Sequence, residues 1–353
     1  MAWTVVSYTN DDLPQIGLFF KHQYTGNGTY GDMGLFQWKI VDNYLMPGVI
    51  NLIKDQDEIV STTSVTPKSL IFRGSRISSA EIGDTYTDTR YQRQGMFSLV
   101  GNKTRENAIE KGIEFIYGLP NDQALPGWKK KANFEVISNL TVKSMAIPLN
   151  IGPQVQRMTH WIPGSIAGSV SPILAFFYLK LRNMFSFSDR TLAIEEIQKL
   201  PEDWEEFWDQ AKSPYEFIIE RDTKALKWRY FNCPNKYRFL LVRKNGKICG
   251  YLVYRIVPGE GVSYLFLADY LFLPGQETAM IPLLKMVLNT AFKYQVNAIR
   301  LWCVQSSPYF SILKRFGFLP RENVPVIGYR NDFTASLSEC RSWHFTIADS
   351  DNV

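Results

Sequence analysis

Apolar residues in the first third of the chain fall in short runs separated by turn residues, a pattern typical of β-strands. The pattern predicts strands at residues 5–10, 49–52, 58–65, 68–73, 76–86 and 115–119. Gly74 marks a hairpin turn before the fifth of these runs. A helical period follows at residues 97–111, and a shorter one occupies residues 18–22. The first third is therefore expected to hold a series of hairpins that leads into a helix.

A similar order of strands and helices returns in the second half. Strands are predicted at 239–244, 247–256, 264–272, 298–304 and 344–347, and helices at 189–200, 203–212, 279–294 and 306–318. Asn245-Gly246 is a strong signal for a hairpin turn. The recurrence indicates that the chain carries one structural pattern twice.

Residues 161–179 separate these two patterns and contain no charged residue. The run reaches the lower length limit for a membrane span, but its two prolines, two glycines and three serines argue against one. We therefore expect no transmembrane segment, and a connector followed by a helix instead. Lys180 and Arg182 follow directly, which leaves a membrane-surface contact open.

The loop between the predicted strand at 76–86 and the helix at 97–111 has the properties of an anion site. It contains Gln92, Arg93, Gln94 and Gly95. A helix start leaves several backbone N–H groups without intrahelical partners, and the helix dipole favours negative charge there. Gly95 lets the backbone approach a ligand closely, while Arg90 and Arg93 add positive charge.

Gln92-Arg-Gln-Gly95-Met-Phe97 resembles the Gln/Arg-x-x-Gly-x-Gly/Ala signature of the GNAT acyltransferases, which bind the pyrophosphate of acyl-CoA. Phe97 departs from it, since the family prefers Gly or Ala there. The resemblance implies acyl-CoA as co-substrate, with either an acetyl or a 3-hydroxybutyryl group. The residues that it assigns to this cofactor are Thr85, Tyr86, Thr87, Gln92, Arg93, Gln94, Gly95, Met96, Phe97 and Asn121.

A second stretch, which begins at Asn121, also resembles the family, whose pattern is Asn-x-x-Ala, a Tyr four residues later, and Gly-Phe beyond. Asn121, Ala124 and Trp128 match the first three positions in spacing, and Phe134 falls one residue late. Asn121 is expected either to bind the pantetheine arm or to cap a helix. Trp128 stands where the family carries the Tyr that protonates the departing thiolate, so the general acid is uncertain.

The resemblance implies an α/β (α+β) fold with two tandem GNAT-like domains, each a mixed, mostly antiparallel sheet flanked by helices. We expect a GNAT domain with the acyl-CoA site at residues 1–148, an apolar connector and helix at 149–188, and a second, degenerate copy at 189–353. Residues 314–318 resemble the closing Gly-Phe of the family, but the pyrophosphate signature is missing from the second copy. That copy is therefore expected not to bind CoA and to help form the acceptor pocket.

Glu81 and Asp84 are the candidate acids beside the site, since in GNAT folds a backbone N–H of this strand polarises the thioester carbonyl. They are three residues apart and face opposite sides of a regular strand, so both can face the site only if a bulge intervenes. Either one could accept the proton of the amine. Salt bridges to Arg73, Arg76 or Arg90 are an equally good explanation.

Tyr30, Phe36 and Trp38 lie in a region that covers the acceptor pocket in GNAT folds. They are candidates for substrate binding, although a role as core aromatics is the stronger expectation.

Composition narrows the class of partner. The chain has 353 residues, 45% of them apolar and 21% charged, which is typical of a globular protein. A net charge of +5 gives no case for nucleic-acid binding and suits anionic small ligands. The four cysteines and three histidines show no metal-ligand spacing, so no metal is expected. The start of the chain lacks the pattern of a secretory signal, and a cytoplasmic location is expected.

Tandem GNAT proteins of about this length resemble enzymes that acylate the amine of a dTDP- or UDP-linked amino-dideoxy sugar for bacterial surface polysaccharide (lipopolysaccharide O-antigen). The partner implied is therefore a small amino-sugar nucleotide. The alternatives are an aminoglycoside or other small-amine acetyltransferase, a peptidoglycan aminoacyl transferase, and a non-catalytic acyl-CoA-binding module. The sugar, the acyl chain and the oligomeric state are left open.

Overall fold

The structure is a computed structural model, which describes residues 3–23, 33–150, 152, 164–184, 189, 191–259, 261–329 and 337–350. The chain divides into two compact units that interleave along the sequence. Unit 1 contains residues 1–141, 215–235 and 324–343, and unit 2 contains residues 142–214, 236–323 and 344–353. The predicted ranges 1–148, 149–188 and 189–353 divide the chain by sequence copy, whereas the two units divide it by compactness. The predicted ranges therefore stay a prediction.

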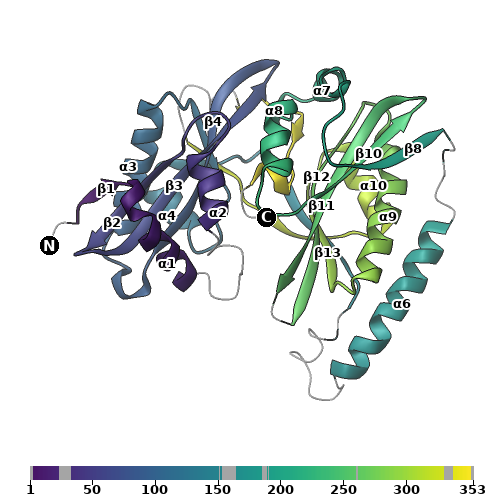
Figure 1. Cartoon of the computed structure of the whole chain (residues 1–353), viewed down its shortest axis with the longest axis horizontal. Coiled ribbons are helices and arrows are strands. Elements are labelled where there is room, and N and C mark those ends of the chain that lie inside the picture. The colour runs from purple at the N-terminus through teal and green to yellow at the C-terminus, as the bar shows by residue number, and fades with distance from the viewer. Residues whose placement is uncertain are drawn as a thin grey trace. The chain divides into compact units, whose positions relative to one another are not determined.

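Unit 1 is a mostly antiparallel sheet with helices packed on it (Figure 1). Its strands are β1 (Val5–Ser7), β2 (Val49–Asp55), β3 (Glu58–Phe72), β4 (Ser75–Thr87), β5 (Phe115–Gly118), β6 (Phe134–Val136), β9 (Phe217–Ile219) and β15 (Ile327–Tyr329). Its helices are α1 (Leu13–Gln23), α2 (Met33–Phe36), α3 (Met96–Glu110), α4 (Leu125–Lys131) and α8 (Thr223–Leu226), with π-helical turns η2 (Gln37–Val41) and η4 (Lys227–Phe231). The strand order is β1-β2-β3-β4-β5-β15-β6, and β4 and β5 run parallel.

Unit 2 repeats this plan. Its strands are β7 (Val142–Pro148), β8 (Leu192–Ile197), β10 (Arg238–Lys244), β11 (Lys247–Gly259), β12 (Val262–Phe272), β13 (Ala298–Val304) and β14 (Leu319–Val324). Its helices are α6 (Gly164–Met184), α7 (Trp204–Lys212), α9 (Met280–Lys293) and α10 (Pro308–Phe316), with 3-10 turns η5 (Glu277–Ala279) and η6 (Ile347–Asp349). The strand order is β14-β7-β13-β12-β11-β10-β8, and β12 and β13 run parallel. Two mostly antiparallel sheets flanked by helices confirm the predicted fold class.

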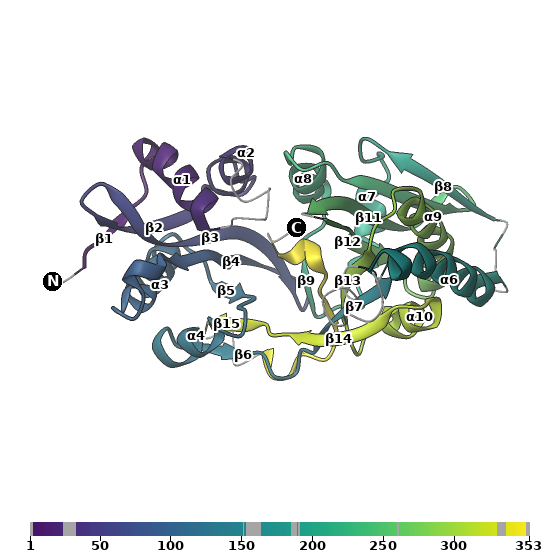
Figure 2. The same cartoon turned by 90° about the horizontal axis from the view of Figure 1, so that it is seen from below.

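The two copies of the pattern exchange a strand. The first copy ends in β7, which lies between β13 and β14 in the sheet of unit 2. The second copy ends in β15, which lies between β5 and β6 in the sheet of unit 1. Figure 2 shows β15, coloured yellow, beside the blue strands of the first copy. Each sheet is therefore completed by the other copy, and neither copy builds its sheet from its own strands alone.

The exchanged strand is part of the hydrophobic core of unit 1. Ile327 of β15 is fully buried and belongs to the same cluster as Val49, Val65 and Ile82. The strand also pairs with β5 and β6 along its length. Burial of an aliphatic side chain of this size stabilises a fold by about 1.5–3 kcal/mol.

Three predicted elements need correction. The strands predicted at 58–65 and 68–73 are one strand, β3, which runs through Pro67, where Asn43 Nδ2 donates to the proline carbonyl at 3.1 Å. The helix predicted at 189–200 is wrong, because residues 192–197 form β8, an edge strand of unit 2. Their half-polar Leu-Ala-Ile-Glu-Glu-Ile pattern suits one buried and one solvated face, and pairing with β10 decides in favour of the strand. The last strand stops at His344 and a 3-10 turn follows.

The helix expected after the apolar connector is α6. Among the described residues, no helix is long and apolar enough to cross a membrane.

Ile327→Ala should lower the free energy of unfolding of unit 1 by about 2–5 kcal/mol, because the change leaves a cavity in a closed core. The matched control is Leu18→Ala in α1, whose side chain is 62% exposed and whose loss should change stability by less than about 0.5 kcal/mol. Chemical denaturation followed by the fluorescence of the tryptophans measures both. Equal midpoints for the two variants would show that β15 is not part of the sheet of unit 1.

Candidate active site

The first structural feature of the site is the point at which β4 and β5 part. Their parallel pairing runs from Ser79–Phe115 to Ile82–Gly118 and ends there, because β5 stops at Gly118. β4 continues to Thr87. Within the described parts of the chain, residues 83–87 of β4 therefore have no strand partner on the β5 side, and the sheet opens between the two strands.

A β-bulge lies directly after this point. Ser64 pairs with Gly83 and Thr62 with Tyr86, so Asp84 and Thr85 together lie opposite Thr63. Asp84 has a φ of +45°, a left-handed conformation that Asp adopts more readily than most side chains. The bulge that the spacing of Glu81 and Asp84 would require is therefore present.

Hydroxyl groups of β3 hold the bulged part of β4 on its other side. Ser61 Oγ donates to the Tyr86 carbonyl at 3.1 Å, and Thr62 Oγ1 donates to the Asp84 carbonyl at 2.8 Å. Ser61, Thr62 and their neighbours Thr63 and Ser64 are fully buried. This buried polar run gives the irregular backbone partners that a regular ladder would otherwise supply.

Asp84 is held by two donors. Lys39 Nζ lies 2.5 Å from Asp84 Oδ2, and Ser64 Oγ donates to the same oxygen at 2.6 Å. The side chains of Lys39 and Asp84 are only 11% and 7% exposed. Among the described residues, no donor contacts Asp84 Oδ1. One carboxylate oxygen is thus fixed by charge-assisted bonds while the other can accept a proton from a ligand.

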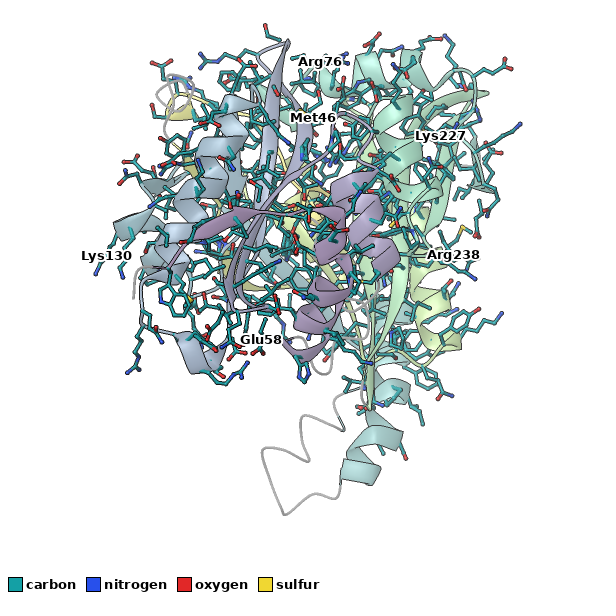
Figure 3. All side chains as sticks on the ribbon, turned by 60° about the vertical axis from the view of Figure 1, so that its left-hand side comes forward. Met46, Glu58, Arg76, Lys130, Lys227 and Arg238 are labelled. Carbon is teal, nitrogen blue, oxygen red and sulfur yellow. The ribbon has the colours of Figure 1, made fainter. Side chains whose placement is uncertain are left out.

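The three arginines considered as partners for Asp84 or Glu81 pair with other acids. Arg73 lies 3.5 Å from Glu216, and Arg76 pairs with Glu220. Arg90 donates to Asp88 and, at 2.5 Å, to Glu58 at the start of β3. Arg76 and Glu58 are labelled in Figure 3.

Glu81 lies before the opening, in the fully paired part of β4. It is 4% exposed and lies opposite Thr66 on β3 and Tyr117 on β5. The structure therefore puts Asp84, and not Glu81, at the point where the sheet opens.

Thr85, Tyr86 and Thr87 form the end of β4 along the opening and are partly exposed. Thr87 Oγ1 lies 2.8 Å from Ser61 Oγ. Burial raises the pKa of the Tyr86 hydroxyl, and the nearby Asp88 carboxylate raises it further. Tyr86 is therefore protonated at neutral pH and its hydroxyl can donate a hydrogen bond.

The loop from β4 to α3 keeps Gln92, Arg93, Gln94 and Gly95 at the surface. Arg93 has a φ of +65° and, among the described residues, makes no ion pair. Gln92 Nε2 donates to the Thr87 carbonyl at 3.3 Å, and Gln94 Oε1 accepts from Trp3 at 3.2 Å. The loop thus presents one free guanidinium at its outer edge.

Gly95 is the N-cap of α3, with a φ of +84°, a conformation that favours glycine. Its carbonyl accepts from the backbone N–H groups of Ser98 and Leu99, both at 3.1 Å. No acceptor among the described residues meets the N–H groups of Met96 and Phe97. Their position at the start of a 15-residue helix suits them to bind an anion.

Asn121 caps the turn that precedes α4. Its Oδ1 accepts from Ala124 N at 2.9 Å, and its carbonyl accepts from Leu125 N at 3.0 Å. The capping role considered from the sequence is therefore present. Its Nδ2 donates to no described residue, so the amide can still contact a ligand.

Met96 and Phe97 pack inward, although the sequence resemblance assigned both to the cofactor. Met96 is 1% exposed in the core below α3. Phe97 lies edge-on to Trp128, with ring centroids 4.9 Å apart. Only the backbone N–H groups of these two residues face the helix start.

Phe97 and Trp128, which both replace residues that the family prefers, therefore touch each other. Trp128 is 3% exposed and packs between α3 and α4, where its ring also limits the space at Gly101. It contacts Phe134, the residue that matches the closing Phe, at 5.0 Å. Trp128 is a core residue that joins the two helices and supplies no acid to the opening.

The three aromatic residues that were candidates for acceptor binding differ in their surroundings. Tyr30 lies outside the described residues. Phe36 is buried among Ile16, Phe20 and Tyr8. It is a core residue, and the core explanation that the sequence favoured for it fits the structure.

Trp38 stacks on Trp228, with ring centroids 4.3 Å apart and planes 15° apart. Trp38 Nε1 donates to the Trp228 carbonyl at 3.0 Å, and Trp228 Nε1 donates to the Trp38 carbonyl at 3.3 Å. Both residues are the second residue of a π-helical turn, and each is followed by a basic residue, Lys39 or Arg229. The guanidinium of Arg229 lies over the ring of Trp38.

This Trp–Trp pair links two equivalent positions of the repeated pattern. It also fixes the turn that carries Lys39, the partner of Asp84. Lys39 and Trp228 are the residues that the sequence reasoning missed. The signal that could have found them is a shared pattern at 36–39 and 226–229: an apolar residue, a polar residue, Trp, and then Lys or Arg.

The second copy keeps the opening but fills it with its own side chains. β12 and β13 pair only from Tyr264–Ala298 to Phe266–Arg300, and β12 continues to Phe272. Tyr270 Oη donates to the Trp302 carbonyl at 2.8 Å, and Phe272 N donates to Tyr309 Oη at 3.0 Å.

The end of the chain packs against the same strand. Thr346 Oγ1 donates to Asp269 Oδ1 at 3.0 Å, and Tyr251 Oη donates to the other oxygen of that carboxylate at 2.7 Å. Asp269 is 1% exposed. Burial raises the pKa of Tyr270 well above its ordinary value, so its hydroxyl stays a hydrogen-bond donor. Side chains thus bond across the opening in this copy.

Residues 5–136 match the model of the acetyltransferase (GNAT) domain. The matched part of the chain, which is similar to GNAT domains, holds the opened sheet, the bulge and the glycine-capped helix. The protein is accordingly an acyltransferase. Among curated proteins, none matches the chain.

Several solved structures share the fold over 93% of this chain. A probable N-acyltransferase from Enterococcus faecalis has a TM-score of 0.61 at 12% identity, with 72% of that chain covered. A GCN5-related N-acetyltransferase from Anabaena variabilis has a TM-score of 0.60 at 13% identity, with 72% covered. The N-myristoyltransferase of Saccharomyces cerevisiae, with bound myristoyl-CoA, has a TM-score of 0.62 at 11% identity, with 82% covered. At these identities the likeness shows the fold.

Trp38→Phe and Trp228→Phe should each destabilise unit 1 by about 1–3 kcal/mol, because each removes a buried indole N–H and leaves a carbonyl without its donor. The double variant should lose less than the sum of the two single changes, with a coupling energy of at least about 0.5 kcal/mol. The denaturation midpoints of the unchanged protein, the two single variants and the double variant give this coupling energy in a double-mutant cycle. Strictly additive losses would mean that the two indoles do not depend on each other.

Proposed function

We propose that the protein transfers an acyl group from acyl-CoA to the amine of a small molecule, at the opening between β4 and β5. The observation that carries this proposal is the joint position of the Asp84 bulge and the free N–H groups at the start of α3, on either side of one loop. The similarity of this part of the chain to GNAT domains supports the same reaction class.

In this proposal the loop and the start of α3 hold the pyrophosphate of CoA. The N–H groups of Met96 and Phe97 and the guanidinium of Arg93 supply donors and positive charge, and Gly95 keeps the approach free of a side chain. The Asn121 amide is positioned to bond the pantetheine arm through Nδ2. The thioester then lies along residues 83–87, where no described strand pairs with β4 on the β5 side.

The reaction requires a neutral amine, a polarised carbonyl and a proton acceptor. A backbone N–H of β4 near Tyr86 or Thr87 polarises the thioester carbonyl and stabilises the oxyanion that forms when the amine attacks. Asp84 Oδ1 accepts the proton of the amine, while Lys39 and Ser64 hold the other oxygen. The C–S bond breaks as the intermediate collapses, and CoA leaves as the thiol after it gains a proton.

The acceptor class that we propose is a dTDP- or UDP-linked amino-dideoxy sugar of bacterial surface polysaccharide, with an acetyl or 3-hydroxybutyryl donor. The support for it is the resemblance of the doubled chain to enzymes of that kind, together with a basic net charge of +5 that suits a diphosphate. Phe36 and Trp38 do not contact the acceptor in this proposal, because both rings are packed inside unit 1.

Release of free thiol from acetyl-CoA, 3-hydroxybutyryl-CoA and myristoyl-CoA should be measured against amino-sugar nucleotides, aminoglycosides and simple amines. We expect turnover with an amino-sugar nucleotide and a short-chain donor, and little with the other acceptors. Turnover confined to aminoglycosides or to the long-chain donor would contradict the proposed substrates. It would still support acyl transfer to an amine. Binding of CoA with no thiol release from any pair would favour a non-catalytic module.

Asp84→Asn should lower kcat by about 10²–10⁴-fold and leave the dissociation constant for CoA nearly unchanged, because a base is lost and the pyrophosphate site is not. Glu81→Gln is the matched control on the same strand, with an expected loss of less than about tenfold. Stopped-time assays across the pH range and CoA titration measure the two effects. If both variants kept normal turnover at every pH, no acid of β4 would be the base, and proximity alone would carry the reaction.

A further inference from the structure

Helix α6 in unit 2 carries an exposed apolar stripe. Six large side chains on it are between 45% and 64% exposed: Val170, Ile173, Leu174, Phe177, Tyr178 and Leu181. Their spacing of three and four residues places them along one side of the helix. Exposed apolar residues scattered singly are common, but a continuous stripe of this length marks an interaction surface.

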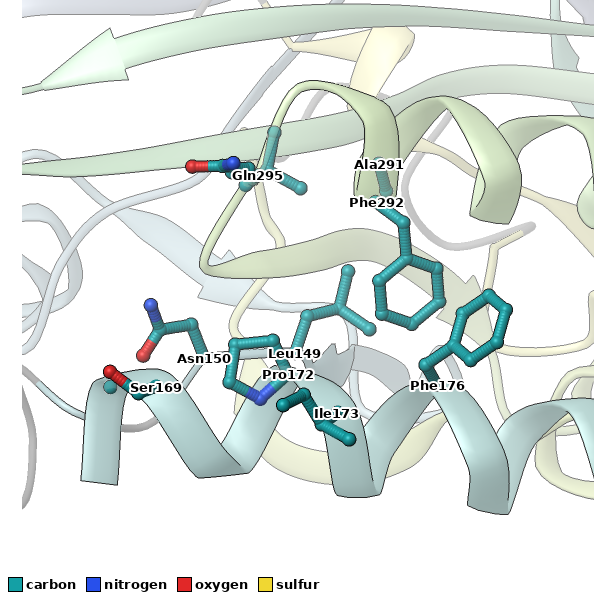
Figure 4. Close-up of a pocket in the computed structure, with 11 residues that line it drawn as sticks. Leu149, Asn150, Ser169, Pro172, Ile173, Phe176, Ala291, Phe292 and Gln295 are labelled. Carbon is teal, nitrogen blue, oxygen red and sulfur yellow. The ribbon is translucent and has the colours of Figure 1, made fainter. Parts of the chain in front are cut away.

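The opposite side of α6 holds the helix on unit 2. Leu179 is 2% exposed and lies close to Gly317 at the end of α10. Phe176 meets Phe292 of α9, with ring centroids 5.1 Å apart. Figure 4 shows these two rings at one end of a cavity of about 430 Å³ between α6 and α9. The inner side of α6 thus already packs on unit 2. The outer stripe is therefore a second apolar surface of the same helix.

The helices around the stripe carry only positive charge. Figures 1 and 2 both show α9 and α10 beside α6. Together the three helices contain six basic residues and no Asp or Glu: Lys180, Arg182, Lys285, Lys293, Lys314 and Arg315. Helix α7 of the same unit, by contrast, has three acids and one lysine. The helices that surround the stripe therefore carry a net positive charge, because no acid balances their basic residues.

Three of these cations form a group at one end of the stripe. Arg182 Nε donates to the Arg315 carbonyl at 2.8 Å, and Nη2 donates to the Lys314 carbonyl at 3.0 Å. Arg182 also lies over the ring of Tyr178, a residue of the stripe. Lys180 lies over the ring of Phe176. Cations and aromatic rings that share one surface in this way suit the boundary between lipid headgroups and acyl chains.

We propose that α6 docks this protein on an anionic membrane surface, with the stripe in the outer acyl region and the cations of α6 and α10 among the headgroups. Charge decides against a second copy of the chain as the occupant. Two copies that met stripe to stripe would bring together two sets of helices that contain basic residues and no Asp or Glu, whereas an anionic bilayer neutralises these helices. The contact is peripheral, since no described helix is long and apolar enough to span a membrane.

This surface lies on helices that take no part in the opening between β4 and β5, so the inference does not depend on the acyl transfer proposed above. It predicts binding that needs both the apolar stripe and the cations. Such binding weakens as salt rises, because the attraction between exposed charges and the bilayer is screened.

Co-sedimentation of the full chain with vesicles tests it. We expect binding to phosphatidylcholine vesicles that contain about one third phosphatidylglycerol, and binding at least about tenfold weaker to pure phosphatidylcholine. The triple change Ile173→Ser, Phe177→Ser, Leu181→Ser should weaken binding to the anionic vesicles by about tenfold or more. Leu18→Ser, at a residue 62% exposed on α1 of unit 1, is the matched control and should bind as the unchanged protein does.

A second variant keeps the test valid if the triple change unfolds unit 2. Lys180→Gln, Lys314→Gln, Arg315→Gln alters only exposed cations and should weaken binding to the anionic vesicles by a similar factor. Circular dichroism checks that each variant is folded, and light scattering after gel filtration reports the oligomeric state. Absence of binding to anionic vesicles, or binding that neither variant weakens, overturns the proposal. A dimer that the serine variant converts to a monomer, without vesicle binding, assigns the stripe to a second copy instead.

Discussion

The ladder between β4 and β5 ends at Ile82 and Gly118, and the candidate site depends on that ending. A strand that continues alone leaves backbone groups without partners on one side, which is costly unless something else bonds them. Here the buried hydroxyls of β3 hold the bulged backbone from the other side. The open side of β4 is thereby kept rigid and available, and the bulge fixes Asp84 at its edge.

The second copy has the same topology, but its opening is occupied by its own side chains. β12 and β13 part in the same way, but here Tyr270 Oη donates to the Trp302 carbonyl and Tyr309 Oη accepts from Phe272 N. Thr346 also bonds to Asp269. The exchanged strands and the stacked Trp38 and Trp228 indicate what this copy contributes to unit 1. It completes the sheet of unit 1 through β15, and Trp228 packs against the turn that carries the partner of Asp84.

The sequence was sufficient for much of the fold, because the hairpin turns at Gly74 and Asn245-Gly246 and the periods around them are local signals. It did not predict β8, since Leu-Ala-Ile-Glu-Glu-Ile fits a helix as well as an edge strand until β10 pairs with it. The sequence also could not predict the ion pair of Lys39 with Asp84 or the stacking of Trp38 on Trp228. Both join residues far apart in the chain, and only the folded pattern brings them together.

Of the two equivalent openings, the one between β4 and β5 is expected to bind CoA and the one between β12 and β13 is not. Titration calorimetry of CoA against the full chain should give one site per chain, because the second opening is filled. Gly95→Val should abolish binding, while Gly275→Val, at a glycine with a φ of +78° in the loop before α9, should leave it intact. Two sites per chain, or loss of binding in the Gly275 variant with the Gly95 variant unaffected, would contradict the account.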